Sequence, residues 1–388
     1  MRVAIVTRIY APEPAAAAFA LRALAERLRD RGHHVTVVTT AVPSTMTIDD
    51  EPGIDVRRAR VIRNRHGYVR GYLQYLSFDL PLALRLLFSH AHDIYVVEPP
   101  PTTGAVTRLV LGLRRRRYLY DAADLWSDAV AMETDSRFVR GSLRWVERFA
   151  LRGAAAVVTI SDGVANRIRE LDIDTPVVVT GFGADANSFR PTGVSSSGPR
   201  PEFIYAGSYS PIHGAEVFVS AFAAFSKTHP GYVLRFIGNG TERGRLEAMA
   251  AALEVDRISF EPLVAPRDLA PILASATATL ASVRPGTGYE YAFATKAYSS
   301  LASGTPVIFS GDGPTSELID SLSDDGLRGG VATAWDANAV AEAMRAIADA
   351  PSTASERAEL AAAVNRDYSL VAVADRIAAV IESVATAR

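Results

Sequence analysis

A chain of 388 residues is too long for one ordinary hydrophobic core, and it suits two α/β domains with a cleft between them. Charged residues make up 22% of it and the formal net charge is -2, so the overall charge gives no reason to expect nucleic-acid binding. The sequence has no cysteine, which excludes disulfides and thiolate metal sites. No apolar run is long enough for a spanning helix or a signal-peptide core. We therefore expect a cytoplasmic protein whose contact with the inner membrane face, if any, is peripheral.

Short segments rich in Val and Ile and bounded by turn residues predict buried parallel strands in the first half of the chain. Between the first two, Ala15–Arg31 has apolar residues at helical spacing and is followed by Gly32, which predicts a helix and its end. The chain therefore opens with a βαβ unit. The predicted strands are Arg2–Thr7, His34–Thr40, Ile94–Glu98, Tyr118–Tyr120, Ala156–Ile160 and Pro176–Thr180.

The second half repeats this alternation, so each half is expected to be a Rossmann-like unit. The Gly, Ser and Pro content of 191–201 predicts a linker between an N-terminal domain 1–190 and a C-terminal domain 202–370. The tail 371–388 is expected to be a helix that packs across the domains, because 371–384 carries a continuous apolar stripe. The predicted strands of this half are Phe203–Ala206, Val233–Ile237, Ile258–Phe260, Thr277–Ala281 and Pro306–Phe309.

Glycine-rich turns follow two of these strands, at the edge where open parallel sheets bind ligands. The turn at 206–214 precedes a predicted helix, and small residues beside a helix N-terminus suit a phosphate group. Its candidate residues are Gly207, Ser208, Tyr209, His213 and Gly214. The turn Gly238-Asn239-Gly240 gives weaker support. For both turns the alternative is a loop closure without a ligand, and His213 is open to the same two interpretations.

A third stretch, 284–306, combines a glycine-rich loop with cations. Lys296 is predicted in the first turn of a helix, where a cation is unfavourable against the helix dipole unless an anion binds there. Arg284 would be a second cation for the same anion. The alternative is that both are solvated surface residues.

The N-terminal half has an acidic and a basic stretch. Residues 121–128, with Asp124 among them, follow the strand predicted to end at Tyr120, and they suit sugar hydroxyls or a helix N-cap. Residues 56–72 mix cations with aromatic rings, which suits an acidic acceptor, anionic lipid headgroups or an ordinary solvated surface. The run Arg114–Arg117 is a second basic patch or an edge gatekeeper. No DNA- or RNA-binding module accompanies these arginines. The acceptor-side candidates are Pro14, Ala15, Ala16, Arg65 and Tyr68.

Taken in order, short motifs over nearly the whole chain resemble the retaining GT-B glycosyltransferases of family 4, especially the branch acting on bacterial glycoconjugates. The motifs are Tyr10-Ala11-Pro12-Glu13-Pro14, Arg31-Gly32-His33-His34-Val35, Asp124-Leu125-Trp126, Gly181-Phe182-Gly183-Ala184-Asp185, Tyr205-Ala206-Gly207, Gly238-Asn239-Gly240, Thr295-Lys296-Ala297-Tyr298 and Ala302-Ser303-Gly304-Thr305-Pro306-Val307. The resemblance implies an α/β fold of two Rossmann-like domains whose parallel sheets face a central cleft. It places the donor nucleotide on the C-terminal domain and the acceptor on the N-terminal domain.

The resemblance also implies transfer without a metal and without a cofactor, the nucleotide-diphosphate sugar being a co-substrate. Arg284 and Lys296 would stabilise the departing diphosphate, and Asp124 would be a catalytic residue of the acceptor side. The positions expected to bind the donor are Gly207, Ser208, Tyr209, His213, Gly214, Gly238, Asn239, Gly240, Leu263, Tyr291, Thr295 and Ser299.

The chain departs from the family pattern at several of these positions. Many members carry two glutamates eight positions apart after the donor loop, and Tyr291 and Ser299 stand in their places, with Glu290 nearby. Ser208 and His213 stand where the first phosphate loop usually has Arg and Lys. Ala123 replaces a His that often precedes the aspartate. These departures bear on the donor's identity and on activity, and they leave the expected fold unchanged.

We therefore expect a hexosyltransferase-type enzyme that uses a nucleotide sugar, with a UDP-sugar favoured. Its acceptor would be a glycan, a polyprenyl-linked lipid or a small natural product. Two alternatives stay open. A GT-B nucleotide-sugar epimerase would form product without any acceptor, and a noncatalytic GT-B-like subunit would bind the donor without turnover.

Overall fold

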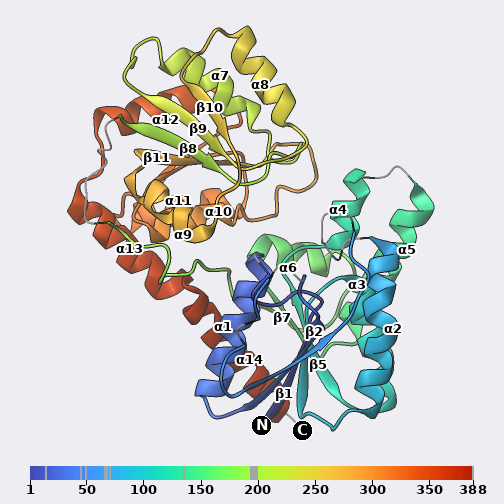
Figure 1. Cartoon of the computed structure of the whole chain (residues 1–388). Coiled ribbons are helices and arrows are strands. Elements are labelled where there is room, and N and C mark those ends of the chain that lie inside the picture. Colours follow the sequence, from blue (N-terminus) through green and yellow to red (C-terminus); the bar gives the residue numbers. More distant parts are fainter. Residues whose placement is uncertain are drawn as a thin grey trace. The chain divides into compact units, whose positions relative to one another are not determined.

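The computed structural model describes residues 1–13, 15–43, 46–48, 50–64, 69, 71–133, 136–192 and 200–386. The chain forms two compact units (Figure 1). Unit 1 combines Met1–Gly181 with Leu370–Arg388, and unit 2 is the continuous stretch Phe182–Ser369. Within the described ranges, no helix is both long and apolar enough to cross a membrane.

Unit 1 is built on a parallel sheet whose strand order, among the described residues, is β3-β2-β1-β4-β5-β6-β7. The central strands are short runs of Val, Ile and Ala that are buried on both faces, as a parallel sheet covered by helices requires. The strands are β1 (Arg2–Val6), β2 (His34–Thr40), β3 (Ile54–Ala59), β4 (Ile94–Val97), β5 (Arg117–Ala122), β6 (Ala156–Thr159) and β7 (Val177–Val179).

Helices cover both faces of this sheet (Figure 1). On one face α1 (Ala16–Asp30) packs against α14 (Leu370–Thr386), and their leucine and isoleucine side chains share a core with β1, β2 and β4. Ion pairs Arg27–Asp375 (2.9 Å) and Arg31–Glu382 (2.6 Å) join the same two helices. The other helices are α2 (Tyr72–Phe88), α3 (Pro101–Leu113), α4 (Trp126–Glu133), α5 (Arg137–Arg152) and α6 (Asp162–Arg169); α3 packs against both α2 and α5.

Unit 2 has a parallel sheet in the order β10-β9-β8-β11-β12-β13 over the residues described. An aromatic core that includes Phe203, Tyr205, Phe222 and Phe236 lies between this sheet, α7 and α12. The strands are β8 (Glu202–Ala206), β9 (Val233–Ile237), β10 (Ile258–Glu261), β11 (Ala278–Ser282), β12 (Val307–Ser310) and β13 (Gly330–Thr333). The helices are α7 (Glu216–Phe225), α8 (Arg243–Ala252), α9 (Pro266–Ser275), α10 (Lys296–Ala302), α11 (Pro314–Asp324), α12 (Ala337–Asp349) and α13 (Ala354–Tyr368).

The two Rossmann-like sheets confirm the predicted fold class, and every predicted strand is present within a residue or two of its expected bounds. The sequence reading missed β3 and β13. Both are edge strands, where burial on two faces does not impose a Val- and Ile-rich run: β3 contains Arg57 and Arg58, and β13 begins at a glycine.

The boundary between the units falls at Gly181 and Phe182, before the predicted linker 191–201, most of which lies outside the described residues. The chain passes back into unit 1 at Leu370. The predicted C-terminal helix is present as α14, and within unit 1 its apolar stripe covers α1.

Candidate active site

In unit 2 the turns after β8 and β9 lie directly against each other. The Gly207 amide donates to the Ile237 carbonyl (2.9 Å), and the Tyr209 amide donates to the Asn239 carbonyl (3.1 Å). A Cβ atom at Gly238 would lie 2.0 Å from the Gly207 carbonyl oxygen, and one at Gly240 would lie 2.2 Å from that of Tyr209. Since such contacts are impossible, the two glycines are required for the turns to meet. The result is a floor of closely packed backbone at the carboxyl edge of the sheet.

The Lys296 ammonium lies above this floor. Lys296 is the first residue of α10, as predicted, and its Nζ donates to the Tyr205 hydroxyl (2.7 Å) and lies 4.0 Å from that ring's centroid. A Cβ at Gly207 would be 3.3 Å from the same Nζ. Lys296 takes part in none of the ion pairs formed by the described residues. Burial lowers the pKa of Lys296 from 10.5 to about 7, so an anion that entered here would restore its positive charge.

Arg284, the second predicted cation, is held by an acidic residue. Its guanidinium forms an ion pair with Glu216, in the first turn of α7, and Glu216 also pairs with Arg245 (3.0 Å). The Arg284 guanidinium also lies 5.3 Å from the centroid of the Trp335 ring. Trp335 in turn donates from Nε1 to the Gly214 carbonyl (3.1 Å). Arg284 is thus fixed next to the first turn with much of its charge already balanced.

His213 is a neutral group in this setting. Its Nδ1 lies 2.7 Å from the Ser210 hydroxyl oxygen, and the Ser282 hydroxyl donates to its carbonyl oxygen. Burial, with a smaller contribution from the positive charge of Lys296, lowers the pKa of His213 to about 3. The imidazole can therefore serve a ligand as a hydrogen-bond group but not as a cation.

Glu290 has a local structural role. Its carboxylate accepts from the Thr287 amide (3.0 Å), while the Thr287 hydroxyl donates to the Arg284 carbonyl (2.9 Å), so the two bonds close the glycine-rich loop between them. A Cβ at Gly313 would lie 2.0 Å from the Glu290 carbonyl oxygen, which makes that glycine necessary. The Glu290 carboxylate therefore stabilises its own loop through the Thr287 amide.

The remaining donor candidates differ in exposure. Tyr209 is fully buried in the aromatic core, so its position does not support a direct side-chain contact with a ligand. Asn239 accepts at Oδ1 from the Gly240 amide (2.9 Å). The half-buried or exposed positions are Ser208, Tyr291, Thr295, Ser299 and Leu263, the last 74% exposed after β10.

In unit 1 the same edge of the sheet carries carboxyl groups. Glu98 directly follows β4, Asp121 belongs to β5 and Asp124 follows β5. Arg8, after β1, is their nearby cation: its guanidinium lies 4.8 Å from the Tyr75 ring centroid and 5.1 Å from that of Trp126. Neither Arg8 nor Glu98 was among the sequence candidates. The signal was available, because Arg8 directly follows one predicted strand and Glu98 is the last residue of another.

Two of these carboxyl groups are hard to ionise. Burial raises the pKa of Glu98 to about 8 and that of Asp121 to about 6. The surroundings of Thr7 agree with a protonated Glu98. The Thr7 hydroxyl lies 2.7 Å from the Ile9 carbonyl and 3.0 Å from Glu98 Oε2, yet it has one hydrogen to donate. A proton on Glu98 satisfies both contacts.

The predicted acidic motif divides into a site residue and structural residues. Asp128 is bound by Arg167 (2.7 Å), and Glu147 caps α4 by accepting from the Trp126 and Ser127 amides (2.7 and 3.2 Å). Asp124 instead lines a pocket of about 1120 Å³, together with Arg8 and Glu13. The rest of that pocket is mostly apolar, with Tyr75 from α2, residues of α4 and the side of α5 that carries Val139, Leu143 and Val146.

The acceptor-side candidates are only partly within the described residues. Pro14, Arg65 and Tyr68 lie outside them, Ala15 precedes the first turn of α1, and Ala16 is its first, exposed residue. The described cations of the 56–72 stretch are largely engaged inside unit 1: Arg58 pairs with Asp50, and Arg63 with Glu13 (2.8 Å). Arg114 donates to the Ser89 carbonyl (2.9 Å) at the end of α2.

Among the described residues, no three His, Asp or Glu side chains come close enough to hold a metal ion.

Comparison with known proteins identifies the class. Residues 16–183 match the family described as glycosyl transferase 4-like domain, and residues 200–350 match glycosyl transferases group 1. A curated relative, a D-inositol 3-phosphate glycosyltransferase from Acidothermus cellulolyticus, is 30% identical over 165 residues, which span 40% of this chain and 35% of that protein.

Solved structures share the fold over the full length. A sucrose-phosphate synthase from Thermosynechococcus elongatus has a TM-score of 0.75 at 18% identity, covering 98% of both chains. The Anabaena protein Alr3699/HepE, solved in complex with UDP and glucose, has a TM-score of 0.73 at 18% identity and covers 99% of this chain and 100% of that one. The fold is GT-B. The chain belongs to the family 4-like glycosyltransferases.

Proposed function

We propose that this glycosyltransferase is a retaining, metal-independent enzyme that moves a hexose from a nucleotide-diphosphate sugar, with UDP favoured, to an acceptor hydroxyl. The observation that carries the proposal is the position of Lys296: a desolvated cation without an ion-pair partner among the described residues, above a glycine floor where backbone can approach a diphosphate. That Anabaena HepE was solved with UDP-glucose supports uridine as the base.

The chemistry proposed needs no protein nucleophile. The bond between the sugar's anomeric carbon and the diphosphate oxygen breaks, and the acceptor oxygen bonds to the same face of that carbon. The acceptor's proton passes to the departing phosphate oxygen, and protonated Lys296 balances the negative charge that builds up there. Lys296 thereby replaces part of what a metal ion would supply.

The acceptor is proposed to bind unit 1 in the pocket that Asp124 lines. Arg8 and Asp124 offer a charged, hydrogen-bonding end to a sugar or phosphate, while α4 and α5 offer an apolar wall. Of the glycan, polyprenyl-linked and small natural-product acceptors, this combination favours one with an apolar part, namely the lipid-linked class.

A ligand-shift calorimetric screen of UDP, GDP, dTDP and their sugars tests the donor assignment. We expect selective stabilisation of wild type by uridine compounds and its loss in Lys296→Ala. The chain has two lysines, so Lys227→Ala, an exposed position in unit 2, is the matched control and should shift like wild type. Equal stabilisation of Lys296→Ala and wild type would contradict the donor site.

Turnover is tested separately. NMR of the product made from an α-linked donor should show an α linkage, and EDTA should leave the rate unchanged. An inverted product, or activity restored only by added divalent metal, would contradict the retaining or the metal-independent part. Product formed without any acceptor would favour the epimerase alternative.

A further inference from the structure

Helix α2 is apolar on both of its sides. Towards the sheet it buries Phe78, Leu82 and Leu86 almost completely. Its outward side exposes leucines spaced three and four residues apart, each between 40% and 70% exposed: Leu73, Leu76, Leu80, Leu84 and Leu87. A helix on a protein surface normally turns polar residues to water. Among the described side chains of α2, every exposed one is apolar.

The neighbouring helices also expose large apolar side chains. Helix α3, which packs against both α2 and α5, exposes Leu113, and α5 exposes Phe138 and Trp145. Phe138 is 83% exposed and also lines the proposed acceptor pocket. We call the exposed sides of α2, α3 and α5 the outer face. Exposed apolar side chains gathered on three helices that pack together indicate a contact with another molecule or with a membrane.

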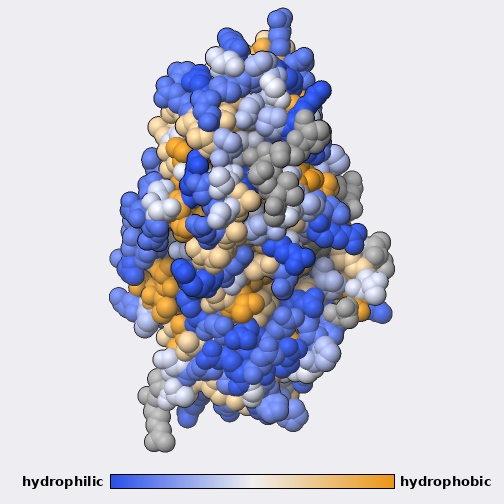
Figure 2. Space-filling model, turned by 90° about the vertical axis from the view of Figure 1, so that its left-hand side faces the viewer, coloured by the Kyte–Doolittle hydropathy of each residue, from blue (hydrophilic) through white to orange (hydrophobic). Residues whose placement is uncertain are grey.

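The charge exposed on these three helices is positive. Their two carboxylates, Asp79 and Glu147, are 1% and 2% exposed; Asp79 accepts from the Thr103 hydroxyl and Glu147 caps α4. The exposed charged residues of α5 include Arg137, Arg140 and Arg144. By contrast, α1 and α14 carry acidic and basic residues joined in pairs. Figure 2 shows hydrophilic residues interspersed with smaller hydrophobic patches on the side that it displays.

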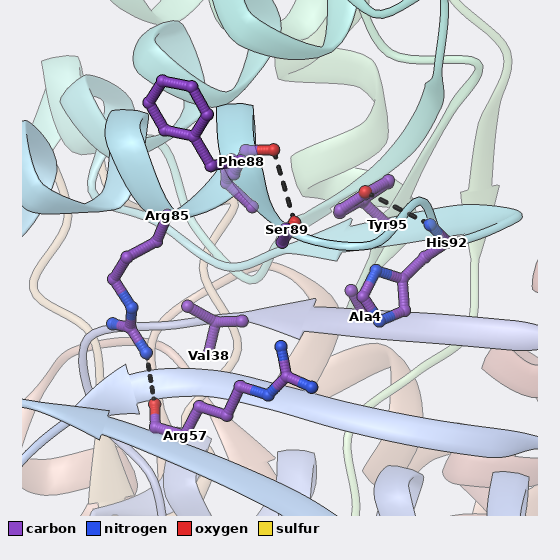
Figure 3. Close-up of a pocket in the computed structure, with 9 residues that line it drawn as sticks. Ala4, Val38, Arg57, Arg85, Phe88, Ser89, His92 and Tyr95 are labelled. Carbon is purple, nitrogen blue, oxygen red and sulfur yellow. Dashed lines mark hydrogen bonds between the residues drawn. The ribbon is translucent and has the colours of Figure 1, made fainter.

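A basic pocket of about 250 Å³ opens at the end of the leucine row, beside the exposed Phe88. Arg57, Arg85 and His92 line it together with apolar residues of the sheet (Figure 3). Arg85 donates to the Arg57 carbonyl (2.8 Å), but its Nη1 and both ring nitrogens of His92 are buried without a hydrogen-bond partner in the part of the chain described. Arg57 is paired with Asp55 (2.7 Å), but none of the described residues that line the pocket is a carboxylate, which suits the phosphate of an anionic headgroup.

We propose that the outer face of unit 1 lies on an anionic lipid bilayer, with its leucines and aromatic rings at the acyl boundary and its arginines among the headgroups. A second copy of the chain fits this face less well, because a two-fold dimer would set the arginines of one copy against those of the other. The surface itself is independent of the proposed function. Only its use, delivery of a lipid-linked acceptor to the adjoining pocket, rests on that function.

Vesicle binding of the full-length protein, without nucleotide or acceptor, tests the proposal. Wild type should co-sediment with phosphatidylcholine vesicles that contain phosphatidylglycerol and bind pure phosphatidylcholine more weakly. The triple variant Leu76→Gln/Leu80→Gln/Leu84→Gln should lose at least about tenfold in partition coefficient. Leu253→Gln, a similarly exposed leucine of unit 2, is the matched control and should bind like wild type.

A second pair separates charge from apolar contact. Arg137→Gln/Arg140→Gln should weaken binding to the anionic vesicles about tenfold and reduce its salt sensitivity, whereas Arg267→Gln, on α9 of unit 2, should change neither. Wild type that fails to bind anionic vesicles, or a triple variant that binds them unchanged, would overturn the proposal. So would a wild-type dimer that the triple variant dissociates, since the face would then be a protein interface.

The outcome can be told apart from failure of the proposed function. The three leucines line neither site, so the triple variant should transfer sugar normally to a detergent-free, short-chain acceptor and slowly to the same headgroup on a long chain in vesicles. Loss of vesicle binding with retained transfer to the short acceptor separates membrane docking from chemistry.

Discussion

In unit 2 the turns at the carboxyl edge of the sheet carry Lys296, Arg284 and His213, whereas in unit 1 the same edge carries Glu98, Asp121 and Asp124. Both edges are built alike, from short buried strands that end in turns. The difference lies in what desolvation does there: it drives Lys296 towards its neutral amine and Glu98 towards its neutral acid. The edge in unit 2 is therefore suited to bind a negatively charged group. The edge in unit 1 offers hydrogen bonds to uncharged groups.

Removal of the Lys296 charge should have the largest effect on activity. We expect Lys296→Met to lower kcat/KM by about 10²-fold to 10³-fold, the range seen when one preorganised group that stabilises developing negative charge is removed. Steady-state rates with saturating acceptor measure this. Lys227→Met is the control, and a loss of less than tenfold in the Lys296 variant would show that another group carries the diphosphate.

The carboxyl groups that follow the strands of unit 1 should affect acceptor binding and leave donor binding unchanged. Asp124→Asn is expected to raise the acceptor KM about 10-fold to 100-fold, the cost of losing a charged hydrogen bond, and to leave the donor Kd unchanged. Rates at varied acceptor and calorimetric titration of the donor measure the two quantities. A weakened donor Kd with an unchanged acceptor KM would reverse the assignment of the two edges.

The pH dependence of donor binding should show whether Lys296 gains its proton when the diphosphate binds. The free protein has Lys296 with a pKa of about 7, and a bound diphosphate raises it. Below pH 7 the lysine is charged both free and bound, so affinity is flat. Above pH 7 binding takes up a proton, and affinity should fall by up to about tenfold per pH unit.

Calorimetry between pH 7.5 and 9, well above the phosphate's own pKa of about 6, isolates this proton. Two buffers with different ionisation enthalpies report the uptake. Lys296→Met should bind weakly at every pH and take up no proton. Equal heats in both buffers for wild type would mean that Lys296 is charged before the donor arrives.

The smallest expected effect is on stability. Burial raises the pKa of Glu98 to about 8 from its ordinary value of 4.5, so the folded protein keeps a proton that the unfolded chain loses. Stability should therefore fall as pH rises between these values and level off above the higher one. Glu98→Gln should remove this share of the fall and raise the apparent Tm at pH 9 by about 5 °C relative to wild type. Asp174→Asn, an exposed acid of unit 1, is the control and should leave the pH profile unchanged.

Much of this architecture was predictable because its signals are local. Buried parallel strands need runs such as Val3–Val6, and a cation that opens a helix conflicts with the helix dipole, which is why Lys296 could be singled out. The edge strand β3 lacks that signal, since its arginines face water or neighbouring acids.

What the sequence could not predict are the partners that distant segments bring. Glu216 and Arg284 are 68 residues apart, and no local sequence pattern predicts the ion pair that holds Arg284 in place. The protonated state of Glu98 likewise depends on burial beside Thr7, 91 residues away. The outer face of α2 was missed for a different reason: a leucine-rich helix is normally interpreted as buried, and only the fold shows that one side of this helix is exposed to water.

The return of the chain into unit 1 has a consequence for biosynthesis. Helix α14 is translated after all of unit 2, so the donor-side unit can finish folding as one uninterrupted stretch while α1 still presents Leu21, Leu24 and Leu28 without part of their covering layer. During that interval the nascent chain is a target for chaperones. A chain that ends before Leu370 would contain all of unit 2, but its unit 1 would lack α14. The apolar side of α1 would then stay exposed, and quality-control factors can recognise such a surface.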